Sequence, residues 1–217
     1  MENLSVIHGD IIVFARTPEE LLERLRIILH RLREVGLKVK PSKCVLFKRD
    51  IEFLGHLVSV NGLDPVRDKL KAIRDWPTLH CLRDVRAFFG FASYYRRFVS
   101  NFASIAEPLT RLTKKITPLK WTDDADLAFS RLKQALLDST TLAFSVPGLP
   151  CILDTDASDV PIGAVLSQVV DGVERPIAYY SRNVNSAQRN GLANSTPFLV
   201  SRIAIRHCKC LHCDVIQ

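Results

Sequence analysis

Two aspartates separated by one residue are the best candidates for chemistry in this sequence of 217 residues. Asp154 and Asp156 follow the apolar run Cys151–Leu153 and precede a second apolar run, Ile162–Gln168. This pattern predicts a strand, an acidic corner and a second strand. Residues two apart on a strand share a face, so the two carboxylates should project together. Such a pair can hold Mg²⁺ for phosphodiester chemistry, although a two-metal site needs more carboxylates than these.

The surrounding sequence predicts an antiparallel meander that would hold these aspartates. Its strands are expected at Cys151–Asp154, Ile162–Gln168 and Pro176–Ser181, with a turn at Asp171-Gly172. The segment 147–150 consists mainly of proline and glycine, and it is therefore a predicted linker and domain boundary.

The first sixty residues are predicted to contain two antiparallel strand pairs. Val6–Phe14 should form two short strands around a turn at His8-Gly9. Cys44–Phe47 and Phe53–Val58 are both apolar and short, and we expect them to pair as an antiparallel ribbon.

Helices are predicted between and after these strands. Thr17 is the expected N-cap of the first helix, with Glu20 in position to complete a capping box and Gly36 suited to end the helix. A short helix is expected within residues 64–76. The sequence from 82 to 115 should be mostly helical.

Aromatic residues recur at helical spacing in this last segment. They are Phe88, Phe91, Tyr95, Phe98 and Phe102. Such a stripe is far more often part of a hydrophobic core than a platform for stacking bases, and we interpret it as core. Thr122 is the expected N-cap of one more helix, whose first turn carries Asp123 and Asp124.

Composition and charge narrow the class of protein. Hydrophobic residues make up 47% and charged residues 24%, a balance typical of globular rather than disordered chains. The net charge of +7 favours a polyanionic partner such as nucleic acid. No apolar run approaches the ~20 residues of a membrane span, and no secretory signal is recognised. We therefore expect an intracellular protein, cytoplasmic or nuclear, with no membrane contact.

The six cysteines have two different settings. Cys44, Cys81 and Cys151 are isolated, and we expect buried, reduced thiols. A cluster at His207–Cys213 could supply zinc ligands, but structural zinc sites usually draw their ligand pairs from two separated turns. Because this cluster is one short run, we favour the interpretation that it does not bind zinc.

Basic residues are interleaved with aromatic residues through two stretches, 38–49 and 69–115. One interpretation is a track of contacts to the phosphates of a duplex. The other is ordinary solvated helix faces. The candidate contacts are Lys38, Lys40, Lys43, Arg86, Arg96 and Arg97.

Ordered motifs lie at 10–14, 36–44, 53–56, 86–98, 121–122 and 154–168. Together they resemble one family, the Pol polyproteins of Gypsy-like long-terminal-repeat retrotransposons. The motifs that resemble the palm end and thumb of a reverse transcriptase lie at 10–14, 36–44 and 53–56, and those that look like its thumb–connection region at 86–98 and 121–122. Asp154–Ser158 with Gly163–Gln168 is similar to the first hairpin of the ribonuclease H domain. The resemblance runs from about Gly9 to Asn190.

This resemblance implies an α+β fold, in which thumb and connection helices precede a partial ribonuclease H-like antiparallel sheet. The implied organisation is palm end and thumb ribbon at 1–60, thumb and connection helices at 61–147, the N-terminal part of a ribonuclease H-like domain at 148–190, and an aberrant tail at 191–217. The implied chemistry is RNA-directed DNA synthesis by nucleotidyl transfer, and hydrolysis of RNA in RNA–DNA hybrids, with Mg²⁺ as cofactor. The resemblance also favours the interpretation that the basic residues bind duplex nucleic acid.

The sequence departs from the family at both implied active sites. The polymerase hairpin of the family carries an aromatic residue, a variable residue and two adjacent aspartates, whereas Ile7, His8, Gly9 and Asp10 stand here. Asp10 is thus a remnant polymerase ligand or an exposed turn aspartate, and we favour the second interpretation because the partner ligands are missing.

At the second implied site, Asp156 matches the first metal ligand of the nuclease. The helix that bears the nuclease glutamate should follow Asn190, but the sequence there is unlike the family. Because that covering helix is damaged, we expect the sheet to open more easily than the helices of 82–137, and the tail to be mobile or misplaced. We expect no catalysis by this chain alone. The alternatives are a non-catalytic module that binds duplex nucleic acid, or a degenerate product without function.

Overall fold

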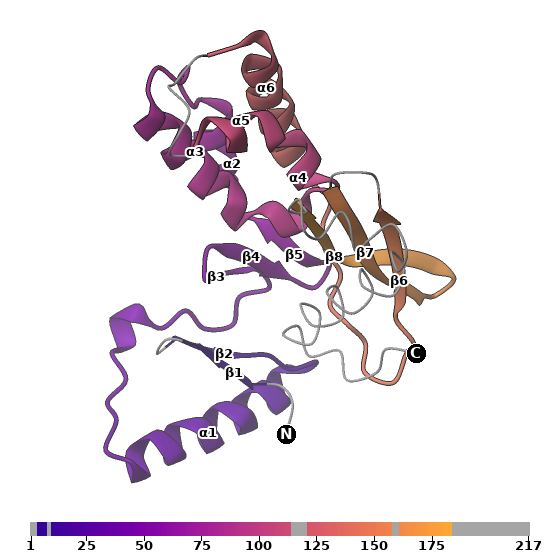
Figure 1. Cartoon of the computed structure of the whole chain (residues 1–217). Helices are drawn as coiled ribbons and strands as arrows, with labels where there is room; N and C mark the ends of the chain where they lie inside the picture. Colours follow the sequence, from indigo (N-terminus) through magenta and orange to yellow (C-terminus); the bar gives the residue numbers. More distant parts are fainter. Residues whose placement is uncertain (1–3, 8–9, 114–120, 158–160, 184–217) are drawn as a thin grey trace. The chain divides into compact units, whose positions relative to one another are not determined.

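The computed structural model describes residues 4–7, 10–113, 121–157 and 161–183. The chain divides into two compact units, residues 1–60 and residues 61–217. Both contain helices and antiparallel strands (Figure 1), which confirms the predicted α+β class. None of the helices in the described ranges combines the length and the apolar character that a membrane span requires.

The first unit begins with the predicted hairpin. Strands β1 (Leu4–Ile7) and β2 (Asp10–Val13) pair antiparallel. Helix α1 (Pro18–Glu34) follows, and the Thr17 side chain accepts a hydrogen bond from the backbone N–H of Glu20 at 3.2 Å. Gly36 has a φ of 73°, the left-handed conformation expected of a residue that ends a helix.

The predicted ribbon pairs different segments in the structure. It consists of β3 (Ile51–Phe53) and β4 (His56–Ser59), joined at Leu54 and Gly55, which both have positive φ. Two consecutive left-handed residues make the tight turn that two-residue hairpins favour. The prediction of a strand at Cys44–Phe47 was wrong, because a short 3₁₀ helix, η1 (Pro41–Lys43), precedes this segment and Phe47 itself has a φ of 53°.

The second unit opens with β5 (Gly62–Pro65) and a set of short helices. Their bounds are α2 (Arg67–Arg74), α3 (Leu82–Tyr94), the 3₁₀ helix η2 (Arg96–Phe98), α4 (Phe102–Ile105), α5 (Glu107–Leu112) and α6 (Asp123–Leu137). The helices of 82–112 confirm the expected helical segment. Thr122 caps α6 as predicted, accepting a hydrogen bond from the N–H of Ala125 at 3.3 Å.

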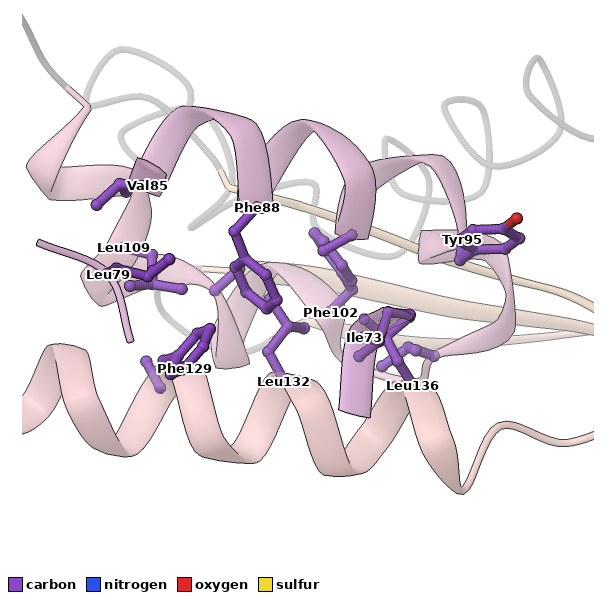
Figure 2. Packing of buried hydrophobic residues seen from close by; sticks show 14 of the residues in the cluster. Ile73, Leu79, Val85, Phe88, Tyr95, Phe102, Leu109, Phe129, Leu132 and Leu136 are labelled. Atoms are coloured by element: carbon purple, nitrogen blue, oxygen red, sulfur yellow. The ribbon is translucent and has the colours of Figure 1, made fainter. Parts of the chain in front are cut away.

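These helices enclose a core that the aromatic stripe helps to build (Figure 2). Phe88 is fully buried, and its ring meets the ring of Phe129 edge-on with centroids 4.7 Å apart. Tyr95, Phe98 and Phe102 are each 2% exposed. The stripe is therefore core, as interpreted from its spacing, and not a surface for stacking bases.

The predicted meander forms one three-stranded sheet, in the order β6–β7–β8. Its strands are longer than expected and span Ile152–Ala157, Pro161–Val170 and Val173–Asn183. The turn at Asp171-Gly172 is confirmed, since both residues have positive φ. Leu153 packs against the small cluster of Cys151, Leu166 and Ile177.

Two buried polar side chains fasten this sheet to its surroundings. Gln168 is 2% exposed, accepts a hydrogen bond from the N–H of Val146 at 2.8 Å and donates to the carbonyls of Val146 and Leu149 at 3.2 and 2.9 Å. Ser181 is 3% exposed, and its Oγ accepts from the N–H of Ala103 in α4 at 2.8 Å. The sheet is thus joined to the helices by hydrogen bonds that satisfy buried backbone groups.

Candidate functional site

The acidic pair lies within a strand rather than at its end. Asp154 and Asp156 belong to β6, whose regular pairing with β7 sets Asp154 opposite Val165 and Asp156 opposite Gly163. Because side chains alternate along a strand, both aspartates lie on the face opposite to Leu153, which packs inward. Both aspartates are exposed. The prediction that they project together is consistent with this register.

A hollow of about 170 Å³ lies beside this pair. Ser100 and Asn101, from the loop between η2 and α4, form part of its lining, together with Asp154 and Asp156. Asn101 has a φ of 54°, a left-handed conformation that asparagine tolerates better than most residues.

The approach of Asn101 to the sheet is close. A Cβ atom added at Gly163 would lie 2.9 Å from Asn101 Oδ1 and 3.9 Å from the Cβ of Asp156. Because residue 163 is a glycine, the loop that contains Asn101 can lie close to strands β6 and β7 beside Asp156. Sequence reasoning missed Ser100 and Asn101, because nothing in their local pattern indicates contact with a strand more than fifty residues away.

Within the described ranges, the two carboxylates near this hollow do not by themselves make a two-metal centre. Enzymes of the reverse transcriptase and ribonuclease H families work with divalent metal ions. Within the described ranges, however, no group of three or more His, Cys, Asp or Glu side chains comes together. Two exposed carboxylates cannot fix the geometry of two ions that must hold both the attacking and the leaving oxygen.

Asp10, the other predicted metal ligand, lies in the first unit at the start of β2, where it pairs with Ile7. No acidic cluster forms around it in the part of the chain that the structure describes. Its part in a polymerase site stays a prediction.

The predicted nucleic-acid contacts of the first unit are all solvent-exposed. Lys38 and Lys40 follow α1 in an extended segment, and Lys43 ends the 3₁₀ helix η1. Exposure leaves their ammonium groups available to phosphates.

The predicted contacts of the second unit have three different settings. Arg86 is exposed on α3. Arg96 donates a hydrogen bond from Nη2 to the carbonyl oxygen of Ser181, and its guanidinium lies 5.6 Å from the centre of the Phe102 ring. Arg97 is half-buried, and burial lowers the pKa of its guanidinium, while the nearby Tyr94 opposes that change.

The cysteines correct one expectation. Cys151 is buried, but Cys44 and Cys81 are exposed, so burial was wrongly predicted for two of the three. Cys81 lies at the N-cap of α3, where the backbone must leave the helix and meet solvent. The His207–Cys213 cluster and the tail after Asn190 lie outside the described residues.

The start of α3 is held by a carboxylate. Asp84 Oδ2 accepts hydrogen bonds from the N–H groups of His80 at 3.1 Å and Cys81 at 3.3 Å. The His80 N–H is the main cause that lowers the pKa of Asp84, and Cys81 adds to the effect. This is the reciprocal half of a capping box.

Two family descriptions match separate parts of the chain. Residues 9–58 match "Reverse transcriptase (RNA-dependent DNA polymerase)", and residues 121–214 match "RNase H-like domain found in reverse transcriptase". The order of the two matches along the chain is the order that the sequence motifs predict.

Relatives that match most of this chain are retrotransposon polyproteins. The retrovirus-related Pol polyprotein from transposon 412 of Drosophila melanogaster is 35% identical over 198 residues, which cover 91% of this chain and 16% of that protein. The corresponding polyprotein from transposon opus of the same organism is 36% identical over 192 residues, covering 83% and 19%. The chain thus spans less than a fifth of the length of these relatives.

The fold agrees with a solved reverse transcriptase. The structure of the foamy viral protease-reverse transcriptase in complex with RNA/DNA hybrid aligns with a TM-score of 0.81 at 22% identity, covering 97% of this chain and 29% of that one. The sequence motifs, the two family matches and the relatives agree, and the chain therefore belongs to the retrotransposon Pol polyproteins, as a segment with a reverse transcriptase part and a ribonuclease H-like part.

Proposed function

We propose that this segment grips duplex nucleic acid, an RNA–DNA hybrid above all, and does not by itself catalyse its synthesis or hydrolysis. One contrast carries the proposal. Most of the basic residues expected to contact phosphates are exposed, whereas the carboxylates expected to hold metal ions are too few in the described part of the chain. Binding needs only charge and shape, but two-metal chemistry fails when its ligands are missing.

The proposed contacts to phosphate are five of the six basic residues derived from the sequence, because the guanidinium of Arg96 already contacts Ser181 and Phe102. They are Lys38, Lys40, Lys43, Arg86 and Arg97. The foamy viral protein that shares this fold was solved with an RNA/DNA hybrid, which supports the choice of partner. Phosphate contacts of this kind position a duplex without reading its sequence.

The chemistry of the family is proposed for a longer polyprotein and not for this segment. There, Asp10 would belong to the site of nucleotidyl transfer and Asp156 to the site of RNA hydrolysis, with Mg²⁺ as the ion at both. In the same scheme, residues 1–60 are palm end and thumb ribbon, 61–147 are thumb and connection helices, and 148–190 begin the ribonuclease H-like domain, with an aberrant tail at 191–217.

Salt-dependent binding tests the proposal. Fluorescence anisotropy with a labelled RNA–DNA hybrid should show binding by the full chain that weakens as salt rises. Replacing Lys38, Lys40 and Lys43 together by glutamine should weaken binding and reduce the salt slope by about 0.9 for each phosphate that is no longer neutralised.

A matched control removes the same charge from the same unit. Arg26, Arg31 and Arg33 are exposed on α1, and their joint replacement by glutamine changes the net charge equally. The proposal expects this control to bind almost as the unaltered chain does. Equal losses in both variants would mean that net charge alone drives binding. Absence of any salt-sensitive binding would favour the second candidate, a degenerate product without function.

A further inference from the structure

Arg96 and Arg97 are adjacent in sequence and equal in charge, but their surroundings differ. We propose that Arg97 binds a backbone phosphate of the duplex, and that Arg96 is a structural residue that ties the helices to the sheet. The inference rests on the proposed function. It assigns different roles to two arginines for which the sequence predicted the same role.

Arg96 is exposed, but its guanidinium makes contacts within the protein. Its Nη2 donates to the carbonyl oxygen of Ser181 in β8, and its guanidinium lies over the Phe102 ring of α4. Ser181 Oγ in turn accepts from the N–H of Ala103. Arg96 thus completes a small network between η2, α4 and β8, and a guanidinium engaged in this way is not free to follow a phosphate.

Arg97 has no comparable partners among the residues that the structure describes. It is half-buried, and its Nε is buried there without a hydrogen-bond partner. It takes part in none of the ion pairs found within the described ranges. The sequence offers it no local counterion, since no Asp or Glu occurs between Asp84 and Glu107. A partly buried cation without an anion is costly unless a ligand supplies one.

Phosphate fits this requirement better than other anions. The guanidinium is planar, stays charged, and presents donors in a fork that matches two phosphate oxygens. Partial burial of Arg97 restricts its side chain before binding, so less rotamer freedom is lost when a phosphate arrives. The stretch from 85 to 106 carries Arg86, Arg96 and Arg97 and no acidic residue, a local excess of positive charge that favours a polyanion over an isolated carboxylate.

The experiment compares Arg97→Gln with Arg96→Gln in the full chain. Both variants lose one charge, so they are matched in net charge. We expect Arg97→Gln to bind the RNA–DNA hybrid about tenfold more weakly at low salt, with the salt slope reduced by about 0.9, and to melt at the same or a higher temperature, since a costly unpaired charge is removed. We expect Arg96→Gln to melt at a lower temperature and to keep the salt slope. Should Arg96→Gln not fold, the structural role is supported, and Arg96→Lys supplies the binding comparison.

Two results would overturn the inference: an unchanged salt slope in Arg97→Gln, or an equal loss of slope in the two variants. A second probe separates the inference from the proposed function. If the unaltered chain binds no hybrid, the proposed function fails, and inorganic pyrophosphate decides the anion site. If pyrophosphate raises the melting temperature of the unaltered chain but not that of Arg97→Gln, the anion site at Arg97 is supported. The same rise in both would refute it.

Discussion

The two units of the chain differ in how far they bury their apolar residues. From residue 11 to residue 60, no side chain is buried. In the second unit, Phe88, Leu132 and Leu136 are each 0% exposed and belong to one large core. Apolar residues at helical spacing are present in both α1 and α6, so the pattern alone does not decide burial. What differs is how many elements pack against the apolar face within the unit.

Helix α1 shows the consequence of having few neighbours. Leu21, Leu25, Ile28 and Leu32 lie on one face and are only half-buried, whereas Leu22 is 47% exposed. Burying a leucine fully contributes about 1.5–3 kcal/mol, and this contribution is partly missing in the first unit. Its stability must therefore lean more on local interactions, such as the Thr17 cap and the contacts of Arg24 with Glu20 and the Phe14 carbonyl.

The largest effect should come from the core itself. Leu132→Ala leaves a cavity among packed side chains, and we expect the free energy of unfolding of the second unit to fall by about 2–5 kcal/mol. Leu22→Ala in α1 should lower the free energy of unfolding of the first unit by about 0.5 kcal/mol at most. Hydrogen exchange of α6 and α1 amides measures each unit separately. Similar losses in the two units would break the comparison.

Two glycines with positive φ, one in each unit, give the next test of this difference in packing. A Cβ at Gly62 would lie 2.2 Å from the carbonyl oxygen of Leu142, and the φ of 136° is strained for any other residue. Gly36 has a φ of 73° but nothing within 4 Å of the added atom. We expect Gly62→Ala to cost about 3 kcal/mol and Gly36→Ala about 1 kcal/mol. Chemical denaturation of the two variants tests this order, which reversed values would contradict.

We also expect the loss of buried hydrogen bonds to cost more stability than the loss of an exposed one. Gln168→Ala removes three hydrogen bonds and leaves backbone groups of Val146 and Leu149 without these partners, which should cost about 2 kcal/mol. Thr17→Ala removes the cap of α1 and should cost about 1 kcal/mol. Urea midpoints for each unit decide the matter. Equal costs would indicate that the buried amide is no better placed than an exposed cap.

The smallest expected effect is the pH dependence of the stability that Asp84 contributes. Since the folded state lowers the pKa of Asp84 below 3.8, its carboxylate stabilises α3 fully above that pH, and the contribution is lost as pH falls through the lowered value. The difference in melting temperature between the unaltered chain and Asp84→Ala should therefore be present at neutral pH and shrink below pH 3.8. Melting curves across that range test it. A difference that grows on acidification would show the sign to be wrong.

Much of the fold follows from local patterns. The cap at Thr17, the aromatic core stripe and the turn at Asp171-Gly172 depend on residues close in sequence, and the structure confirms them. The strand expected at Cys44–Phe47 failed for a local reason as well, because Phe47 adopts a left-handed conformation that few residues other than glycine take.

Long-range contacts could not be predicted. Nothing in the local sequence brings Asn101 to Gly163, or Arg96 to Ser181. The expectation that the sheet opens more easily than the helices rested on a missing cover. It stays a prediction, although η2 and α4 supply contacts to β8 that it did not foresee.

The central claim is that this segment holds a duplex but does not hydrolyse it. The direct measurement incubates the full chain with an RNA–DNA hybrid labelled on its RNA strand, in the presence of Mg²⁺, at a protein concentration that saturates binding. We expect the RNA to remain intact while bound, and Asp156→Asn to bind equally well. Mg²⁺-dependent cleavage that disappears in Asp156→Asn would contradict the claim.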